Sequence, residues 1–317
     1  MCTTRVFFTT DLHGSDICFR KFLNVAKLYE AKVLIVGGDI TGKMIVPIVN
    51  RGDGTYSTLY LGTERMMKTS NELTAFQSKI TSMGYYPHVV VPEEMTELKN
   101  SPQKVEMLFD KLMVERVRDW VKLADERLAG SGTKCFIQPG NDDRFGIDEV
   151  FKSSKSVVNP EGTLQLLDER HEMISTGFTN QTPWQCPRDI SEEELEKKID
   201  AMAVQVNDMK NCVFNLHCPP YDTPLDLAPK LDSNLKPEME GGSVKMVPVG
   251  STSVKKAIEK YQPLVALHGH IHESKGSVDI GRTLCLNPGS EYGEGILRGV
   301  IFDLTDKGMR DFLLTSG

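Results

Sequence analysis

Five short polar fragments of this 317-residue chain carry side chains that could hold metal ions. They are Asp11-Leu12-His13, Gly38-Asp39, Gly140-Asn141-Asp142, Leu216-His217-Cys218 and Gly269-His270-Ile271-His272. Together they offer the carboxylate, amide and imidazole ligands that two adjacent divalent ions need, and Asp39 could bridge both ions. A two-metal site ionises a water molecule and stabilises an in-line displacement at phosphorus. The fragments therefore indicate chemistry on phosphate esters.

Each fragment follows a short apolar run that is typical of a β-strand. The runs cover residues 4–10, 32–36, 134–139, 212–216 and 263–267. Asp11 and His13 stand two positions apart, so in extended backbone they would point to the same side. Because ligands of open α/β sheets gather at the carboxyl ends of the strands, we expect all five fragments to meet there.

The segment between the first two strands predicts a helix. Residues 15–30 carry apolar side chains at helical spacing, so strand, helix and strand form a βαβ unit. Each fragment alone has an ordinary alternative, because Gly-Asp is common in turns and Asn-Asp in helix caps. The order of all five fragments, each at the end of a strand, is what argues against coincidence.

In this order the fragments resemble the signature of the calcineurin-like metallophosphoesterase superfamily. That signature reads Asp-x-His, Gly-Asp, Gly-Asn-His-Asp/Glu, a lone His and Gly-His-x-His. The resemblance runs from Asp11 to about Ser290 and includes the trailing sequence 287–290. It implies an α/β fold of four layers (α/β/β/α), with two packed mixed β-sheets flanked by helices and the metal site at the carboxyl ends of strands. It also implies that residues 1–317 form a single metallophosphoesterase domain.

The resemblance implies metal ligands and a reaction. The first metal ion would be held by Asp11, His13, Asp39 and His272, and the second by Asp39, Asn141, His217 and His270. A hydroxide that bridges the ions would attack phosphorus in line, and would hydrolyse a phosphomonoester or phosphodiester of a small molecule. The metals and Asn141 would stabilise the charge on the phosphoryl oxygens. Oxygen and nitrogen ligands suit Mn²⁺, Fe, Zn²⁺, Co²⁺ or Ni²⁺.

One position departs from the signature. Asp142 stands where most members have a histidine that is credited with protonating the leaving group. Asp142 could act as the acid only if burial or the neighbouring Asp143 kept it protonated. Otherwise the reaction uses no protein acid, His268 or another residue substitutes, or Asp142 orients Asn141 or a ligand histidine. Arg144 could contact a phosphate, but an exposed loop arginine is the simpler interpretation.

Residues 44–130 form an insertion that is long for a simple α/β crossover. Its sequence predicts a β-hairpin over residues 44–61 and helices over residues 64–83 and 103–128. The insertion could form a cap over the metals or the surface of a homodimer.

A second insertion covers residues 219–250 and begins beside His217. We therefore expect it to border the substrate site, where Tyr221, Asp222 and Lys230 could touch substrate. Between the two insertions, residues 192–209 predict a charged and exposed helix.

Composition limits the function classes. The net charge of −7 and the pI of about 5.6 argue against broad affinity for nucleic acid, which usually needs a basic patch. Seven cysteines without a Cys-x-x-Cys pair predict reduced, mostly buried thiols. With neither an N-terminal signal nor an apolar run of membrane-spanning length, the expected location is the cytoplasm.

Three alternatives compete with a small-molecule phosphoesterase. Residues 37–43 match the phosphate-binding Gly-x-x-x-x-Gly-Lys loop, but Met44 stands where Ser or Thr should be, and this interpretation leaves the other fragments unexplained. A non-catalytic scaffold of the same fold would usually have lost metal ligands, whereas all seven expected positions carry a suitable residue. A nuclease of the same superfamily would bind DNA in a salt-dependent way.

Overall fold

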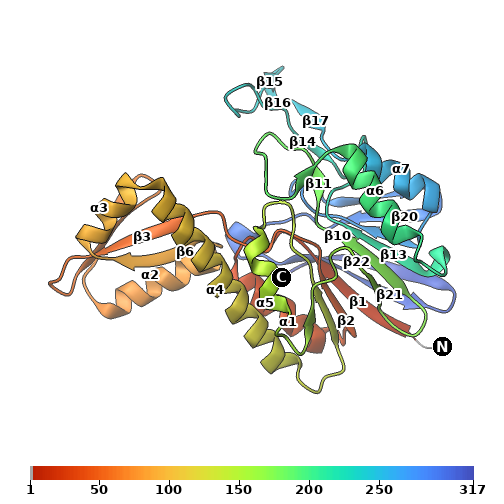
Figure 1. Ribbon diagram of the computed structural model, residues 1–317, viewed down its shortest axis with the longest axis horizontal. Helices are drawn as coiled ribbons and strands as arrows, with labels where there is room; N and C mark the ends of the chain where they lie inside the picture. The colour runs from red at the N-terminus through yellow and green to blue at the C-terminus, as the bar shows by residue number, and fades with distance from the viewer. Residues whose placement is uncertain (1–2) are drawn as a thin grey trace.

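The computed structural model describes residues 3–317 and has two six-stranded mixed β-sheets at its centre (Figure 1). The first sheet has the order β22 (Gly308–Ser316), β21 (Arg298–Thr305), β1 (Thr3–Thr9), β2 (Val33–Val36), β7 (Lys134–Ile137), β8 (Val157–Val158). The second has the order β19 (Gly276–Ile280), β20 (Thr283–Asn287), β18 (Val265–Leu267), β13 (Cys212–Leu216), β10 (Glu172–Thr176), β9 (Leu164–Leu166). Parallel strands form the centre of each sheet. Antiparallel strands complete the edges, except that the edge strand β8 is parallel to β7.

The strands of both sheets carry apolar side chains on both faces. One face of each sheet therefore packs against the other sheet, and the opposite face packs against helices. Val6 and Phe8 of β1 lie in the hydrophobic cluster between the sheets, whereas Phe7 lies in the cluster under the helices. In β2, Ile35 faces the opposite sheet and Leu34 faces the helices in the same way. Strands that are buried on both faces explain the uninterrupted apolar runs in the sequence.

Two pairs of helices cover the outer faces of the sheets. The clusters of buried side chains place α1 (Asp16–Leu28) and α4 (Pro102–Leu128) on the first sheet, and α6 (Glu192–Ala203) and α7 (Thr252–Tyr261) on the second. The expected four-layer α/β/β/α architecture is therefore confirmed. The expected helix over residues 192–209 was wrong in length and exposure, because α6 ends at Ala203 and buries Leu195 and Ile199 against the sheet.

The first insertion forms a separate lobe, defined here as residues 44–100, which projects to the left in Figure 1. Its sheet has the order β5 (Thr63–Met67), β4 (Tyr56–Tyr60), β3 (Ile45–Asn50), β6 (Tyr86–Val90). Two helices accompany it, α2 (Ser70–Ser82) and α3 (Pro92–Asn100). The predicted hairpin is present as β3 and β4, but the start of the predicted helix at residue 64 was wrong. Leu61 and Gly62 have positive φ and turn the chain into β5, and α2 begins only after the Thr69 cap.

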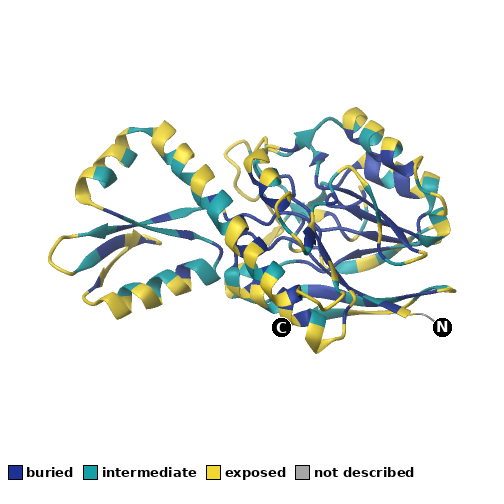
Figure 2. Ribbon diagram, turned by 60° about the horizontal axis from the view of Figure 1, so that its bottom comes forward, coloured by how far each residue is buried: buried dark blue, intermediate teal, exposed yellow. Residues whose placement is uncertain are grey.

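The long helix α4 connects the lobe to the core. With 27 residues it is about 40 Å long. Its buried side chains begin at Met113 and continue to Leu128, whereas most residues before Met113 are exposed or half-buried (Figure 2). The predicted helix over residues 103–128 is thus confirmed, and only its second part belongs to the core.

The second insertion is an arm of two short antiparallel ribbons that stands away from the sheets at the top of Figure 1. The ribbons pair β14 (Leu227–Pro229) with β17 (Met246–Pro248), and β15 (Met239–Glu240) with β16 (Ser243–Val244). The buried carboxylate of Asp226 closes the base of the arm by accepting backbone N–H groups of Asp222, Thr223 and Gly250. Lys230 pairs with Glu238 inside the arm.

The remaining elements are short: α5 (Asp148–Phe151), β11 (Thr179–Asn180), β12 (Asp189–Ile190), and three 3₁₀ turns, Phe145–Ile147, Met209–Asn211 and Tyr292–Glu294. Across residues 3–317, no helix combines the length and the apolar character needed to cross a bilayer. The cysteines of this range are free thiols, and all but Cys186 are buried.

Candidate metal centre

The five fragments meet at one end of the two sheets, as expected from their positions after strands. Asp11, Asp39 and Asn141 follow β1, β2 and β7 of the first sheet, and histidines 217, 270 and 272 follow β13 and β18 of the second. Their side chains form two clusters that could hold metal ions, Asp11/His13/His272 and Asp39/His217/His270. Within each cluster the potential ligand atoms lie within 4.8 Å of one another.

The separations between these atoms suit a shared ion. Nε2 of His13 lies 3.1 Å from Nε2 of His272, and the latter lies 3.4 Å from Oδ1 of Asp11. In the second cluster, Nε2 of His217 lies 3.4 Å from Oδ1 of Asp39. Ligands that surround one ion tetrahedrally at about 2.1 Å are about 3.4 Å apart. The donor set of oxygen and nitrogen atoms therefore fits divalent ions.

The backbone at four of these residues is not extended. φ is +54° at Asp11, +39° at His13, +50° at Asp39 and +68° at His270. The expectation that extended backbone aligns Asp11 with His13 was therefore wrong. Left-handed backbone at non-glycine residues costs free energy and persists only where the surroundings impose it. Here the N–H groups of Asp11 and His13 donate to the carbonyl oxygens of Gly38 and Asp39, at 2.9 Å each, and so lock the two loops together.

Two motif glycines make room for the ligands. A Cβ atom at Gly140 would overlap the amide nitrogen and Oδ1 of Asp39. A Cβ atom at Gly269 would overlap Oγ1 of Thr10 and Oδ2 of Asp11. These close approaches explain why glycine precedes Asn141 and His270.

Asn141 is oriented by a residue that the sequence did not single out. Its Nδ2 donates to Oδ1 of Asp189 at 3.0 Å, and its buried Oδ1 has no hydrogen-bond partner. Asp189 is itself fixed, because its Oδ2 accepts the backbone N–H groups of Thr182 and Cys186. The amide oxygen of Asn141 is thus the atom left free for a ligand role. The contact between Asp189 and this amide follows no spacing pattern, so only the structure reveals it.

The imidazole of His217 is also held in one orientation. Its Nδ1 lies 3.1 Å from the carbonyl oxygen of Gly37, so this nitrogen carries the proton and donates it. Its buried Nε2 has no other hydrogen-bond partner and is left to bind an ion. His268 differs, because its Nδ1 lies 2.8 Å from the carbonyl oxygen of Leu216 and it joins neither cluster.

The electrostatics of the clusters suit cation binding. Burial opposes charge on Asp11, but the hydrogen bond and charge of His272 outweigh it and lower the Asp11 pKa to about 2. Burial lowers the pKa of His13 and His270 to about 4, which favours neutral imidazoles with free lone pairs. Burial also opposes charge on His217, yet the neighbouring Asp39 raises its pKa to about 9. The two buried carboxylates, Asp11 and Asp39, therefore favour the binding of positive charge between the two clusters.

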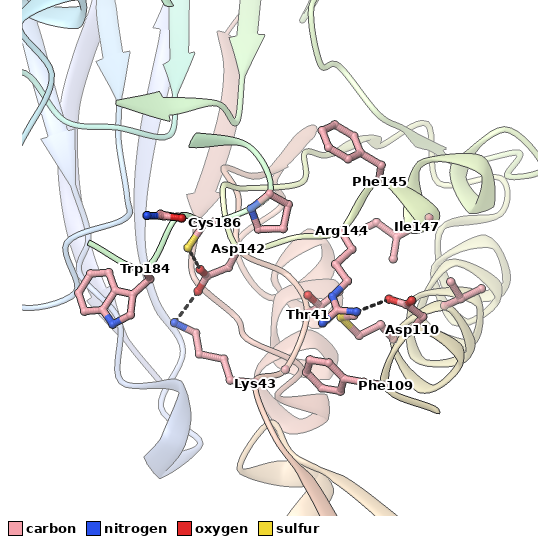
Figure 3. Close-up of a pocket in the computed structure, with 16 residues that line it drawn as sticks. Thr41, Lys43, Phe109, Asp110, Asp142, Arg144, Phe145, Ile147, Trp184 and Cys186 are labelled. Atoms are coloured by element: carbon pink, nitrogen blue, oxygen red, sulfur yellow. Dashed lines mark hydrogen bonds and ion pairs between the residues drawn. The ribbon is translucent and has the colours of Figure 1, made fainter. Parts of the chain in front are cut away.

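Asp142 borders the clusters and is bound by two partners. It forms a third group of potential ligands with His13 and Asp39. Nζ of Lys43 lies 2.6 Å from its Oδ2, and the thiol of Cys186 donates to its Oδ1 at 2.8 Å (Figure 3). Burial lowers the pKa of Lys43, but the charges of Asp142 and Asp39 outweigh it and raise it. Sequence reasoning considered Lys43 only as part of a nucleotide-binding loop.

The structure contradicts that nucleotide-binding alternative. In such a loop free N–H groups surround the phosphates, whereas here Oδ2 and Oδ1 of buried Asp143 accept the N–H groups of Ile40 and Thr41. The N–H group of Gly42 donates to the hydroxyl of Tyr86. A strand, β3, follows instead of a helix. Asp143 also accepts the N–H group of Gly140, so it joins the loop after β2 to the loop after β7.

Arg144 has a structural role that the sequence did not indicate. Its guanidinium forms ion pairs with Glu106 and Asp110 of α4, at 2.5 and 2.7 Å. It is half-buried and fastens the loop after Asn141 to that helix. A contact with phosphate would have to compete with both carboxylates.

Comparison with known proteins supports the fold. No family model matches the chain. The uncharacterized protein MJ1162 of Methanocaldococcus jannaschii is 31% identical over 152 residues, which are 47% of this chain and 61% of that protein. The match thus spans less than two thirds of that relative.

Two solved structures share the architecture. One aligns with 99% of this chain and 99% of its own chain at 17% identity, with a TM-score of 0.59. The structure of TT1561 of Thermus thermophilus aligns with 100% of this chain and 99% of its own at 12% identity, with a TM-score of 0.53. At these identities the comparison shows a shared fold.

Proposed function

We propose that this protein hydrolyses a phosphomonoester or phosphodiester of a small molecule with the help of two divalent metal ions. The observation that supports this most is the pair of adjacent Asp/His clusters at the sheet ends. Two buried atoms at this place, Oδ1 of Asn141 and Nε2 of His217, have no hydrogen-bond partner. Buried polar atoms normally have a bonding partner, so a bound ion would supply the partner that these two atoms lack.

The proposed ligands follow the two clusters. Asp11, His13, Asp39 and His272 would hold one ion, and Asp39, Asn141, His217 and His270 the other. When bound, the ions would supply an ionised water molecule and polarise the phosphoryl oxygens. Mn²⁺, Fe, Zn²⁺, Co²⁺ and Ni²⁺ all accept such oxygen and nitrogen ligands.

Asn141 and Asp142 remain the proposed catalytic residues, and Lys43 joins them. Asp142 could protonate the leaving oxygen, as the position of the family histidine suggests. Its ion pair with Lys43 supports a second role, in which Asp142 holds a cation beside the place of the phosphoryl group. The ammonium would then donate to a phosphoryl oxygen and stabilise the charge that develops there.

Hydrolysis of p-nitrophenyl phosphate and bis-p-nitrophenyl phosphate by metal-stripped protein, with Mn²⁺, Ni²⁺, Zn²⁺ or Mg²⁺ added back, tests the function. We expect metal-dependent turnover and, in Asp39→Asn, loss of both turnover and bound metal, because the Asp39 carboxylate is the proposed ligand that both ions share. Asp53→Asn in an exposed turn of the lobe is the matched control and should behave as wild type. Unchanged turnover of Asp39→Asn would reject the site, and failure of the wild type to bind metal would favour the scaffold.

A comparison of leaving groups separates the two roles of Asp142. If Asp142 is the acid, Asp142→Asn should slow phenyl phosphate more than p-nitrophenyl phosphate, because the poorer leaving group needs the proton more. If it holds Lys43, Asp142→Asn and Lys43→Met should slow both esters alike, and the double variant should be little slower than either single variant. Additive losses with no dependence on leaving group would contradict both roles. The homodimer through residues 44–130 and the cytoplasmic location stay predictions.

A further inference from the structure

A cavity of about 810 Å³ opens beside the candidate metal centre (Figure 3). Asp142 and Lys43 belong to its lining, and Asp142 also belongs to the group of potential ligands with His13 and Asp39. The cavity therefore borders the place where phosphorus would react. Its volume far exceeds that of a phosphate group and is in the range of pockets for drug-sized ligands, about 300–1,000 Å³.

The walls of this cavity are rich in apolar and aromatic side chains. Phe109, Met113 and Val114 come from α4, and Phe145 and Trp184 come from the loops that follow Asn141 and precede Asp189. Phe145 is 53% exposed and Trp184 is 61% exposed, although large aromatic side chains usually gain from burial. In Figure 3, Trp184 lies to the left of the Lys43–Asp142 pair, whereas Phe145 lies above Arg144 and Phe109 below it.

The charged groups of the cavity are already paired. Lys43 is bound to Asp142, and Arg144 is bound to Asp110 and Glu106. The positive charges are therefore balanced by carboxylates, and the wall offers no free cation for a second phosphate. What remains available is aromatic and aliphatic surface. Phe145 is supported on one face by the buried guanidinium of Arg188, 4.4 Å from its ring centre.

We propose that this cavity binds the aromatic or heteroaromatic part of the substrate, so that the natural substrate is a phosphate ester whose organic group carries a flat ring. The proposal rests on the proposed function, because the ester phosphorus would lie at the metal centre. Ring stacking on exposed Phe145 and Trp184 recognises planarity as well as apolar character. A saturated ring of the same size gains only the apolar part, and this difference makes the proposal testable.

Calorimetric titration of the metal-loaded protein with benzylphosphonate and cyclohexylmethylphosphonate provides the first test. The two probes share the phosphonate group and nearly the same size, and neither is hydrolysed. We expect about three- to tenfold tighter binding of the benzyl compound, as aromatic pairs typically give. Phe145→Leu and Trp184→Leu should reduce this preference, whereas Phe312→Leu, an exposed aromatic on β22, should keep it. Metal content and circular dichroism check that each variant is folded.

The hydrolysis of benzyl phosphate and cyclohexylmethyl phosphate provides the second test, since their leaving groups have similar basicity. A benzyl preference in kcat/KM that weakens in Phe145→Leu and Trp184→Leu supports the proposal. Equal binding of the two phosphonates by the wild type would overturn it, as would a preference that survives in both variants. If no ester is hydrolysed although metal binds, the proposed function fails, and the titration still decides whether the cavity selects a ring.

Discussion

The loops at the sheet ends and the lobe differ in how strongly the rest of the molecule fixes them. In the loops, buried Asp11 and Asp39 and half-buried His270 adopt left-handed backbone that is held by hydrogen bonds between loops of distant sequence. In the lobe, the buried apolar cluster consists of Val46, Tyr60 and Ile80, and most residues around it are exposed or half-buried (Figure 2).

The strained backbone therefore lies in the region that is best supported, and the weakly supported region is the lobe. Strained backbone survives at the metal centre because two packed sheets and their covering helices surround it. The lobe has one small apolar cluster of its own, and α4 ties it to the core. A small core opens locally at lower cost than a large one. We therefore expect changes at the sheet ends to affect catalysis strongly and changes in the lobe to act locally.

The largest effect is expected from Gly140→Ala. Its added methyl group would overlap Asp39 and push that carboxylate away from His217 and His270. Because displacement of a reacting group by about 1 Å can cost about 100-fold in rate, we expect at least that loss of kcat together with weaker metal binding. Steady-state kinetics and metal analysis of the purified variant measure both quantities.

Gly293→Ala is the matched control for this prediction. A Cβ atom at Gly293 meets no atom within 4 Å, and its backbone needs no positive φ. The variant should therefore keep its metals and its activity. Equal losses in the two variants would show that general destabilisation, and not the position of Asp39, explains the effect of Gly140→Ala.

An intermediate effect is expected from a pair of isoleucine substitutions. Ile35 lies between the two sheets and Ile80 lies in the lobe, and both are fully buried. Each change to alanine should cost about 2–5 kcal/mol in the region that it affects. Ile35→Ala should lower the stability of the whole molecule, whereas Ile80→Ala should raise hydrogen exchange in residues 44–100 and leave exchange in β1 and β2 unchanged. Faster exchange throughout the core of Ile80→Ala would show that lobe and core unfold as one unit.

The sequence predicted the core more accurately than the lobe for a physical reason. The core strands β1, β2 and β13 are buried on both faces, so their apolar runs end where the polar fragments begin. In the lobe, the mostly exposed strand β5 has the composition of a helix start, and only the turn at Leu61 and Gly62 decides its structure. Local composition predicts a strand well when burial on both faces excludes polar residues.

At the candidate site, too, the sequence indicated some residues and not others. The seven expected ligand positions could be named from the sequence because each belongs to a motif with fixed spacing. Other residues contact the site from distant segments of the chain, and the spacing of residues in the sequence does not predict such contacts. They are Lys43, Asp189 and Cys186. The left-handed backbone was missed as well, because it results from hydrogen bonds between loops and not from the residue types of Asp11 and His13.

The smallest effect concerns two carboxylates outside the candidate metal-binding groups, Asp168 in the core and Asp53 in the lobe. Burial opposes charge on Asp168, but hydrogen bonds from Thr4 and from the N–H groups of His171 and Arg170 outweigh it and lower its pKa to about 2. The hydrogen bonds of Thr55 lower the pKa of Asp53, which is fully exposed to solvent.

A pKa below the ordinary value of 3.8 means that the ionised form stabilises the folded state. The contribution of Asp168 is therefore present above about pH 4 and is lost as the pH falls towards 2. Asp168→Asn removes the charge, so its unfolding free energy should fall less steeply than that of the wild type between pH 4 and pH 2. Asp53→Asn should follow the wild-type curve, because solvent screens a charge in an exposed turn. Urea titrations at a series of pH values measure the slopes, and a larger change for Asp53→Asn would reverse the contrast between core and lobe.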